Sequence, residues 1–366
     1  VPWWDTAARG EMADLLSVWP NISTLHAIGL LDVRNAFTPA REYAVKQLER
    51  VVDDELQHYL PQLVQVLKFE AYATSRLALF LLRRALTNRG TIGQLFYWLL
   101  LGERGDALSL RFRLLAEVYV EQCGSQAMEL KLQETLLLTF LDVCTDVRAA
   151  PDNATERARA RLEAVNTVLS TQPGTLPFPT REELQAVETG RCKVFDSNAH
   201  PVLVHCVVSH EFAETRAYIF KAGDNLMQDF VTLRMFSLMD ELWKKEGLDL
   251  RMTVYNVLAT GKTSGVIEFV PNCETIHAIQ RMQDGVTGAF SERAIFNWLN
   301  ERAASVQELY RAVENFTFSC AGYCVATYVI GVGDRHNDNI MVTRDGHLFH
   351  IDFSHFLGNV IKLGPY

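Results

Sequence analysis

One stretch near the end of the sequence, from Asp334 to Asp352, restricts the possible folds more than any other. It reads Asp-Arg-His-Asn-Asp-Asn-Ile-Met, reaches a turn at Asp345-Gly346 and returns through His-Ile-Asp-Phe. This order predicts a loop, one short hairpin and a second loop, so that two polar side chains can converge on one cation. Phosphoryl transfer needs a carboxylate beside the accepting hydroxyl and oxygen ligands that hold Mg²⁺ against the phosphates of ATP. The stretch therefore predicts a phosphoryl-transfer site.

The spacing within this stretch gives each polar residue a candidate role. Asp334 and Asn339 have the Asp-x-x-x-x-Asn spacing of a kinase catalytic loop, which makes Asp334 the candidate base or hydroxyl-orienting group. His336 can shuttle a proton or stabilise the transition state near neutral pH. Asn339 and Asp352 are the candidate ligands of Mg²⁺. Arg335 is expected to brace the loop.

Residues upstream of this stretch can supply the contacts to the phosphates of ATP. Lys221 ends a predicted strand, and its candidate partner is Asp229 in the first turns of the following helix. Ser197 lies in a glycine-free turn between the first two predicted strands, where it can offer a hydroxyl and backbone N–H groups to phosphate. An exposed lysine and a solvated aspartate at a helix start are the structural alternative for the first two residues.

A strand that enters a hinge is predicted at Glu268 and Val270, just before a proline. Backbone carbonyl and amide groups at these two residues can bind the edge of adenine, and a plain buried strand is the competing interpretation. Tyr255 is expected to line the deeper part of the adenine pocket, with a core tyrosine as the alternative. Together with the lysine, these residues predict a complete nucleotide site.

Histidines near the same loop raise a different possibility, a metallohydrolase centre. His336, His347, His350 and His355 could combine with the aspartates as metal ligands. However, the sequence has no His-Glu-x-x-His or comparable ligand spacing, and His350 falls in a predicted strand. Phosphoryl transfer is therefore the preferred prediction.

Composition and charge describe a soluble globular chain. Its 366 residues are 48% hydrophobic and 22% charged, which predicts two or three domains. A net charge of −9 gives no support for nucleic-acid binding. The nearly apolar stretch from Cys320 to Gly333 is too short to cross a bilayer and is expected to be a buried helix. Seven cysteines without a regular framework suggest reduced thiols, with Cys320 and Cys324 in core packing.

The pattern is helical up to about Cys144 and mixed beyond Thr180. Apolar residues recur at helical spacing in the segments 44–52, 54–68, 75–86 and 111–122. Helix pairs in series predict an α-solenoid-like domain. A loop at 149–155, a charged helix and a segment with three prolines follow, and the last marks the clearest boundary. Strands are then expected at 191–195, 201–208, 217–221, 252–258 and 265–270. Helices are expected at 227–246, 293–299 and 307–329.

Four motifs resemble the phosphoinositide 3-kinase catalytic region. They are Phe-Lys-Ala-Gly-Asp-Asn-Leu-Met-Gln-Asp at 220–229, Ser-Cys-Ala-Gly-Tyr-Cys-Val-Ala-Thr at 319–327, Gly-Asp-Arg-His-Asn-Asp-Asn-Ile-Met at 333–341 and Leu-Phe-His-Ile-Asp-Phe at 348–353. The helical part, with Tyr-Leu-Pro-Gln-Leu-Val-Gln-Val-Leu-Lys at 59–68, resembles the accessory helical domain of that family. Ser-Asn-Ala-His-Pro at 197–201 and Val-Pro-Asn-Cys-Glu-Thr at 270–275 look most like the class II branch, which contains C2 domains.

The resemblance implies an α+β multidomain chain. An accessory helical domain would span 1–145 and a helical linker 146–185. A bilobal protein-kinase-like fold would follow, with the N-lobe at 186–271 and a partial C-lobe at 272–366. The resemblance also implies that Lys221 contacts phosphate, that Asp229 supports the inner pocket and that Met341 and Ile351 form the floor of the adenine pocket.

The activity implied is transfer of the ATP γ-phosphate to the 3-hydroxyl of phosphatidylinositol or its 4-phosphate, with ATP and Mg²⁺ as cofactors. The resemblance also implies a lipid substrate at a membrane surface. It further implies a cytoplasmic location with peripheral association to plasma or endosomal membranes. Adaptor or coat proteins could bind through regions outside this sequence. The sequence ends where the activation loop would begin, so the chain is expected to be a fragment of a longer enzyme.

Several residues depart from the family pattern. Asn225 and Met227 replace the usual second Asp and Arg, and Ser354 replaces the glycine of Asp-Phe-Gly. A serine at a positive φ would be strained, so Ser354→Gly is expected to accelerate turnover by up to roughly tenfold. A catalytically impaired pseudokinase or helical scaffold therefore stays open as an alternative. A protein kinase of the related large group fits the loop at 197–201 less well.

Overall fold

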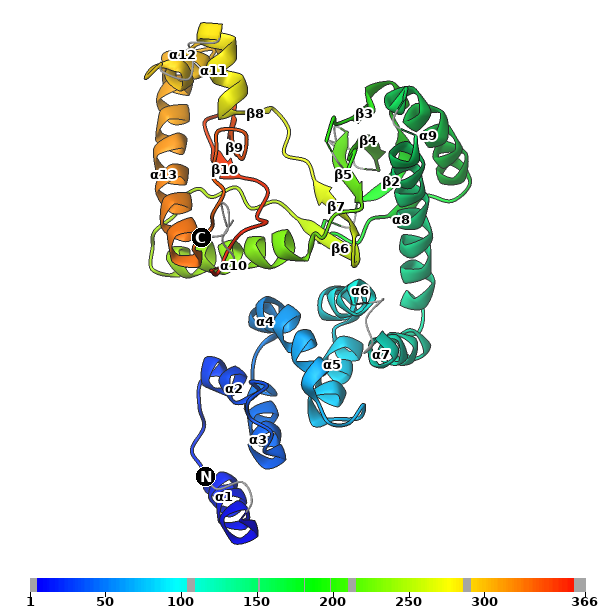
Figure 1. Cartoon of the computed structure of the whole chain (residues 1–366), viewed down its shortest axis with the longest axis vertical. Helices are drawn as coiled ribbons and strands as arrows, with labels where there is room; N and C mark the ends of the chain where they lie inside the picture. The colour runs from blue at the N-terminus through cyan, green and yellow to red at the C-terminus, as the bar shows by residue number, and fades with distance from the viewer. Residues whose placement is uncertain are drawn as a thin grey trace, which may run out of the picture. The chain divides into compact units, whose positions relative to one another are not determined.

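The computed structural model describes residues 5–103, 109–150, 152–180, 182–197, 199–209, 215–285 and 291–358. The chain folds into two compact units. The first comprises Val1–Thr139, Gly174–Glu183 and Thr260–Lys262, and the second comprises Phe140–Pro173, Leu184–Ala259 and Thr263–Tyr366. Figure 1 shows the helices and strands of both units with their labels. In the described ranges, no helix combines the length and hydrophobicity needed to span a bilayer.

The first unit is helical, as predicted. Its helices are α1 (Thr6–Val18), α2 (Thr24–Leu30), α3 (Thr38–Leu48), α4 (Asp53–Val66), α5 (Arg76–Thr87), α6 (Gln94–Gly102), α7 (Ser109–Gln122) and the first part of α8 (Gln126–Ala149). A 3₁₀ turn at Leu67–Phe69, a π-helical turn at Arg89–Gly93 and the short strand β1 (Gly174–Thr175) complete it. The starts of α2 and α5 follow the capping rule, because the Ser23 and Ser75 hydroxyls accept hydrogen bonds from the His26 and Ala78 N–H groups. Successive helices pack on one another, for example α2 on α3 and α6 on α7.

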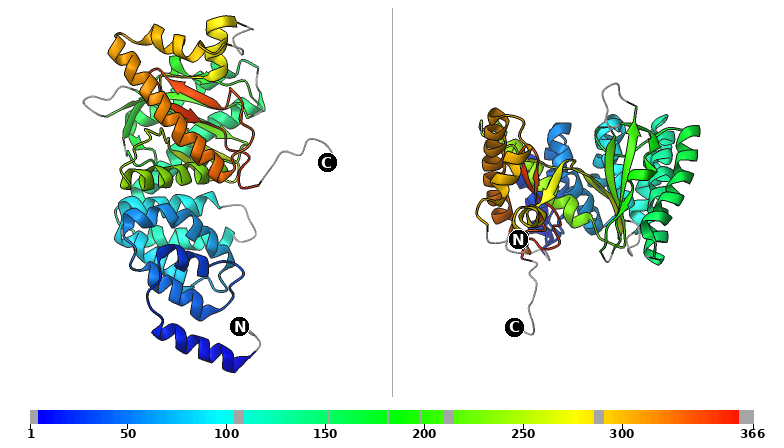
Figure 2. Two further views of the ribbon diagram at one scale, coloured as in Figure 1. Left: turned by 90° about the vertical axis from the view of Figure 1, so that its left-hand side faces the viewer. Right: turned by 90° about the horizontal axis from the view of Figure 1, so that it is seen from above.

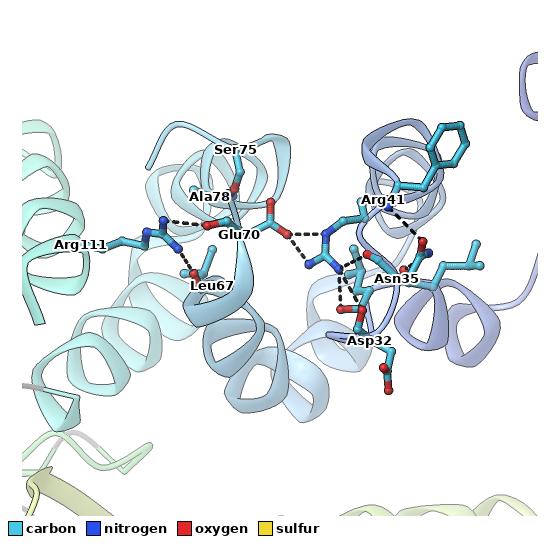
Figure 3. A network of polar contacts seen from close by, with 11 residues as sticks. Asp32, Asn35, Arg41, Leu67, Glu70, Ser75, Ala78 and Arg111 are labelled. Atoms are coloured by element: carbon cyan, nitrogen blue, oxygen red, sulfur yellow. Dashed lines mark hydrogen bonds and ion pairs between the residues drawn. The ribbon is translucent and has the colours of Figure 1, made fainter. Parts of the chain in front are cut away.

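A polar network that the sequence did not predict holds the turns of this helical unit together (Figure 3). The guanidinium of Arg41 is buried, pairs with the Glu70 carboxylate, and donates to three backbone carbonyls of the loop at 31–35. Arg111 donates to the Leu67 carbonyl and, at 2.8 Å, to the Glu70 carbonyl. Because these carbonyls lie in the loop after α2 and in the turn after α4, the two arginines hold both connections in place.

Replacement of Glu70 by glutamine should lower the free energy of unfolding of the helical unit by about 2 kcal/mol. The amide keeps a hydrogen bond but leaves the Arg41 charge buried without a counter-charge. Glu49→Gln is the matched control, because Glu49 pairs with Arg76 and Arg83 at the surface and such pairs contribute less than about 1 kcal/mol. Urea unfolding followed by circular dichroism measures both. Equal effects of the two variants would contradict a special role for Glu70.

The second unit begins with two helices and an antiparallel sheet. The rest of α8 and α9 (Ala154–Thr171) precede the strands β2 (Glu183–Val187), β3 (Lys193–Val194), β4 (Val202–Val208), β5 (Arg216–Ala222), β6 (Val257–Gly261) and β7 (Ser264–Glu268). The sheet order is β2-β4-β5-β7-β6, and β3 pairs with β4. The ring of Phe140 on α8 stacks on Phe220 of β5 at 4.4 Å, which fixes the helix to one face of the sheet. The long helix α10 (Met227–Lys245) follows β5, as predicted.

The remainder of this unit combines helices with a small sheet. The helices are α11 (Ile276–Asp284), α12 (Ala294–Arg302) and α13 (Val306–Ile330), and the strands are β8 (Cys273–Thr275), β9 (Ile340–Thr343) and β10 (Leu348–His350). The sheet order is β10-β9-β8, and α13 packs on β10. Figures 1 and 2 show α13 running beside these strands. The α+β fold class, with a helical domain before a β-rich lobe and a partial helical lobe, is therefore confirmed.

The hairpin predicted within the stretch from Asp334 to Asp352 is present, and its turn needs Gly346. β9 and β10 pair antiparallel, with Phe349 opposite Met341. Gly346 has φ of +93°, and a Cβ there would lie 1.9 Å from the carbonyl oxygen of Ala312 on α13. Both the backbone angle and the close approach exclude a larger residue. The glycine therefore sets the distance between the hairpin and α13.

Two local predictions differ from the structure. The strand expected at 252–258 begins only at Val257, because the Asn256 N–H is taken by the Glu268 carboxylate rather than by a neighbouring strand. The apolar stretch on α13 is not fully buried, because the helix packs one face on the hairpin and leaves the other to solvent. Tyr328 is 87% exposed. Cys324 is also exposed, so the core packing expected for Cys324 is wrong. The Cys320 and Cys324 sulfurs lie 3.9 Å apart on the helix surface.

Candidate active site

Nine of the twelve candidate residues line one cavity of about 360 Å³ in the second unit. They are Lys221, Asp229, Tyr255, Glu268, Val270, Asn339, Met341, Ile351 and Asp352. Ser197, Asp334 and His336 are exposed and do not line it. Asn198 follows Ser197 in the turn that is expected to offer N–H groups to phosphate, and it lies outside the described residues. The cavity therefore joins residues of the sheet, the hinge and the catalytic stretch.

Eight further lining residues were missed, and most of them are apolar. They are Phe195, Pro201, Ile219, Ile267, Phe269, Cys273, Thr275 and Phe349. Strand periodicity could have found some of them, because residues two apart on a strand share a face. Ile219 precedes Lys221 by two residues on β5 and pairs with Ile267 of β7. Thr275 pairs with Met341, which pairs with Phe349 across the small sheet. These residues give the cavity two apolar walls.

Such walls suit a flat, largely apolar ring between them, with polar groups at the edge that fix its orientation. The hinge edge is held in place by Glu268, whose carboxylate accepts from the Asn256 side chain at 2.7 Å. The Val270 carbonyl accepts from the Cys273 thiol at 2.9 Å. Deeper in the cavity, the Tyr255 hydroxyl donates to the His350 carbonyl, and burial raises the pKa of Tyr255 well above its ordinary value. Tyr255 therefore stays neutral.

The charged end of the cavity carries one cation and several carboxylates. Lys221 is the only lysine or arginine among the described residues that line the cavity. Its ammonium lies 3.1 Å from the carboxylate of Asp224, so the expected pairing with Asp229 is replaced by a closer partner in the turn after β5. Asp229 instead accepts a hydrogen bond from the Phe353 N–H at 3.1 Å. Asp229 thus ties α10 to the segment that carries Asp352.

Burial raises the pKa of Asp229 to about 6, while the Phe353 N–H and the Lys221 charge oppose this rise. Because this value exceeds the ordinary 3.8, the folded state holds the proton more tightly than the unfolded state. The resulting stability is complete below about pH 4 and is lost as the pH rises through about 6. At pH 8 the ionised, mostly buried carboxylate therefore works against folding.

Asp229→Asn should consequently stabilise the nucleotide-free protein at pH 8 by about 2 kcal/mol and at pH 5 by roughly half as much. A pKa difference of about 2 corresponds to ~3 kcal/mol, and partial exposure reduces that figure. The asparagine oxygen can still accept from Phe353. Thermal unfolding at the two pH values measures the effect, with exposed Asp142→Asn on α8 as the control. A gain that is equal at both pH values would show that ionisation of Asp229 is not the cause.

The stretch from Asp334 to Asp352 is fixed by hydrogen bonds from side chains and N–H groups to its backbone carbonyls. The Asn339 side-chain nitrogen donates to the Asp334 carbonyl at 2.9 Å, and the Ile351 N–H donates to the Asn339 carbonyl at 3.0 Å. Arg335 braces the stretch, as predicted. Its guanidinium donates to the carbonyls of Gly333, Asn339, Ile351 and Asp352. One arginine therefore holds the loop before the hairpin and the loop after it.

Two of the candidate site residues, Asp334 and Asp352, have left-handed backbones. The φ angles are +52° at Asp334 and +60° at Asp352, two of seven non-glycine residues with positive φ in the described part of the chain. Such conformations cost energy for most residues, although Asp and Asn tolerate them best. They persist where the surroundings enforce them, and the four carbonyl contacts of Arg335 provide that enforcement. The strain therefore lies at two of the residues that the sequence predicted for the site.

Ser354 is not strained, which overturns the expectation for this position. It is absent from the residues with positive φ, so a glycine there relieves nothing. Its hydroxyl donates to one oxygen of the Asp352 carboxylate at 2.6 Å. The serine therefore orients the carboxylate, and the argument for an impaired enzyme loses the support that this residue gave it.

Ser354→Gly and Ser354→Ala should both slow turnover and raise the Mg²⁺ concentration for half-maximal rate by about fivefold. One exposed hydrogen bond to a charged group contributes roughly 1 kcal/mol, which corresponds to that factor. Mg²⁺ titrations of the rate compare the two variants with the natural protein. The alanine variant separates the lost hydrogen bond from any backbone effect. A glycine variant faster than both others would restore the strain hypothesis.

The donor set fits a hard cation. The Asn339 nitrogen is used by the Asp334 carbonyl, which leaves its side-chain oxygen as the acceptor beside the cavity. Asp352 contributes a carboxylate, and oxygen ligands are those that Mg²⁺ prefers. In the part of the chain that the structure describes, no three His, Cys, Asp or Glu side chains are grouped to hold a metal ion. A cation at this site would therefore be shared with the nucleotide.

The histidines have distinct environments. The Nδ1 atom of His336 accepts from the Asp338 N–H at 3.3 Å, which leaves Nε2 as the donor of the neutral ring at the exposed side of the loop. His350 is buried and stacks on Tyr323 with ring centres 5.1 Å apart. Burial and the nearby Arg335 charge lower the pKa of His350 to about 4, so its ring stays neutral. His350 therefore belongs to the core of this unit.

An antiparallel sheet with a lysine, a hinge strand and a loop-hairpin-loop carrying Asn339 and Asp352 is the architecture of a kinase-like phosphotransferase. Models of two domains match the chain. The model "Phosphatidylinositol 3- and 4-kinase" matches residues 215–366, and the model "Phosphoinositide 3-kinase family, accessory domain (PIK domain)" matches residues 1–132. The chain belongs to the phosphoinositide 3-kinase family and combines its accessory domain with part of its kinase domain.

Curated relatives match almost the whole chain. Phosphatidylinositol 3-kinase 1 of Dictyostelium discoideum is 41% identical over 99% of the chain. Phosphatidylinositol 4-phosphate 3-kinase C2 domain-containing subunit alpha of Pongo abelii is 39% identical over 100%, and subunit beta of Homo sapiens is 38% identical over 99%. The chain spans 23% of the first relative and 22% of each of the others. Relatives thus include the C2-domain branch and the Dictyostelium enzymes at similar identity.

Proposed function

We propose that the gene product containing this chain transfers the γ-phosphate of ATP to the 3-hydroxyl of phosphatidylinositol or phosphatidylinositol 4-phosphate. The observation that carries the proposal is the single cavity that joins Lys221, the hinge at Glu268 and Val270, and the pair Asn339 and Asp352. The domain division at 1–145, 146–185, 186–271 and 272–366 is part of the same proposal. Family membership supports the lipid substrate.

In this proposal the apolar walls bind adenine, and backbone groups of Glu268 and Val270 bind its edge. Tyr255 closes the deep end, and Met341 and Ile351 form the floor. The Lys221 ammonium binds phosphate oxygens, and the turn at Ser197 covers the phosphates. Mg²⁺ held by Asn339 and Asp352 would neutralise charge on the β- and γ-phosphates. Asp229 keeps α10 joined to the segment that carries Asp352.

Asp334 and His336 act on the acceptor side. They are exposed beside the cavity, where a hydroxyl group presented from outside the protein can reach them. Asp334 orients the 3-hydroxyl and accepts its proton, and the Nε2–H of His336 donates to an oxygen of the phosphoryl group in transfer. A substrate embedded in a bilayer places the reaction at the cytoplasmic surface of the plasma or endosomal membranes. Adaptor or coat proteins would bind through other regions.

The test is a lipid kinase assay of the purified gene product on vesicles that contain phosphatidylinositol or its 4-phosphate. We expect a product with new phosphate at the 3-position, identified by chromatography of the deacylated lipid, and dependence on Mg²⁺. Phosphate at the 4-position would overturn the assigned regiochemistry. Nucleotide binding without transfer to any lipid would favour the scaffold alternative, and transfer to protein alone would favour a protein kinase.

A further inference from the structure

A small cavity of about 90 Å³ lies between α10 and the segment 254–257 and shares Tyr255 with the nucleotide cavity. Arg234 and Ser237 line it from the helix, and Tyr255 and Asn256 line it from the facing segment. No aspartate or glutamate is among the described residues that line it. The cavity therefore carries a positive charge without a counter-charge in its walls.

The arginine in this wall has no polar partner in the described part of the chain. Its guanidinium lies over the Phe230 ring, one turn earlier on α10, with 5.4 Å between the guanidinium carbon and the ring centre. Burial lowers the pKa of Arg234, and no nearby charge offsets this effect. The Arg234 side chain is only partly exposed, and its guanidinium has five N–H donors that can bind an acceptor. The cavity beside it is where a partner can sit.

The chemistry of the walls defines that partner. Arg234 and Ser237 are three residues apart on a helix, so their side chains share a face and can donate to one ligand. The fork of a guanidinium matches two oxygens of a planar or tetrahedral oxoanion. A volume of about 90 Å³ equals that of roughly three water molecules. We propose that this cavity binds a small oxoanion, inorganic phosphate or its analogue sulfate, through Arg234 and Ser237.

The position of the cavity links it to the nucleotide site. Tyr255 lines both cavities, and the N–H and side-chain amide of Asn256 both donate to the carboxylate of Glu268 at the hinge. A bound anion would restrain both residues. Phosphate is therefore expected to tighten nucleotide binding by about twofold to fivefold, since it would order the hinge before the nucleotide arrives. The anion site stands independently of the proposed lipid substrate.

The experiment is thermal unfolding of the 366-residue chain at constant ionic strength, with sodium phosphate or sodium sulfate replacing sodium chloride. We expect a saturable rise on the order of 5 °C at a phosphate concentration one hundred times the dissociation constant. Arg234→Gln should lose this rise. Without phosphate the variant should be at least as stable as the natural protein, because it removes a partly buried charge that has no counter-charge in the cavity walls.

Lys221→Met separates this site from the nucleotide cavity. It should keep the full rise with phosphate, because Lys221 lines only the larger cavity of the two. Ser237→Ala should weaken phosphate binding by about fivefold in isothermal titration calorimetry, and it carries the test if Arg234→Gln does not fold. The proposal is overturned by the absence of any rise, by an equal rise in Arg234→Gln, or by loss of the rise in Lys221→Met.

Discussion

Lys221→Met is expected to reduce turnover by 10²–10³-fold while the protein stays folded. The ammonium is the only cation among the described residues of the nucleotide cavity, which also contains three carboxylates, Asp229, Glu268 and Asp352. Loss of one preorganised charge at developing negative charge costs about 3–4 kcal/mol in the transition state, which gives that factor. Methionine keeps the apolar stem of the side chain.

The rate is measured with saturating Mg·ATP and lipid vesicles, and nucleotide affinity is measured separately by titration with a fluorescent ATP analogue. Lys245→Met on α10 is the matched control, because Lys245 is exposed and far along the helix from the cavity. The control should retain its full rate. Unchanged turnover in Lys221→Met would remove this residue from the site.

Arg335→Lys is expected to destabilise the second unit by about 4 kcal/mol and to abolish detectable turnover. Lysine keeps the charge but cannot reach four carbonyl groups on both sides of the hairpin at once. Hydrogen bonds from a charged donor contribute about 1.5–3 kcal/mol each, and water replaces part of that loss at these partly exposed carbonyls. Asp334 and Asp352 then lose the contacts that join the two loops and hold their backbones in the left-handed region.

Thermal unfolding and the rate assay are carried out on the same preparations. Arg344→Lys is the control, because Arg344 is an exposed residue at the end of the neighbouring strand β9. It should change the melting temperature by no more than about 1 °C. If Arg335→Lys has the stability and the rate of the natural protein, the four hydrogen bonds of Arg335 do not set the geometry of Asp334 and Asp352.

The sequence predicted what depends on spacing along the chain. Asp334, Asn339 and Asp352 are separated by one loop and one hairpin, so their local geometry follows from short segments. The predicted hairpin and the lysine-bearing strand were confirmed for the same reason. The roles of all twelve candidate residues, including Asp334, His336 and Ser197, stay predictions.

What the sequence could not predict depends on contacts between distant segments. β8 has three residues, and it becomes a strand only because β9 pairs with it. Asp224 takes the place of Asp229 as the partner of Lys221. This pairing depends on the conformation of the turn after β5, which the periodicity of apolar residues does not predict. The buried pair of Arg41 and Glu70 joins residues 29 positions apart. The exposed face of α13 was missed because an apolar stretch does not reveal which of its faces finds a partner.

The left-handed backbones at Asp334 and Asp352 decide how an inactive variant of this protein should be made. Alanine at either position would combine two effects, the lost carboxylate and a backbone penalty of roughly 1–2 kcal/mol for a residue that avoids positive φ. Asparagine adopts the same angles readily and has nearly the same shape. A comparison of alanine with asparagine at each position thus separates the chemistry of the side chain from the conformation that presents it.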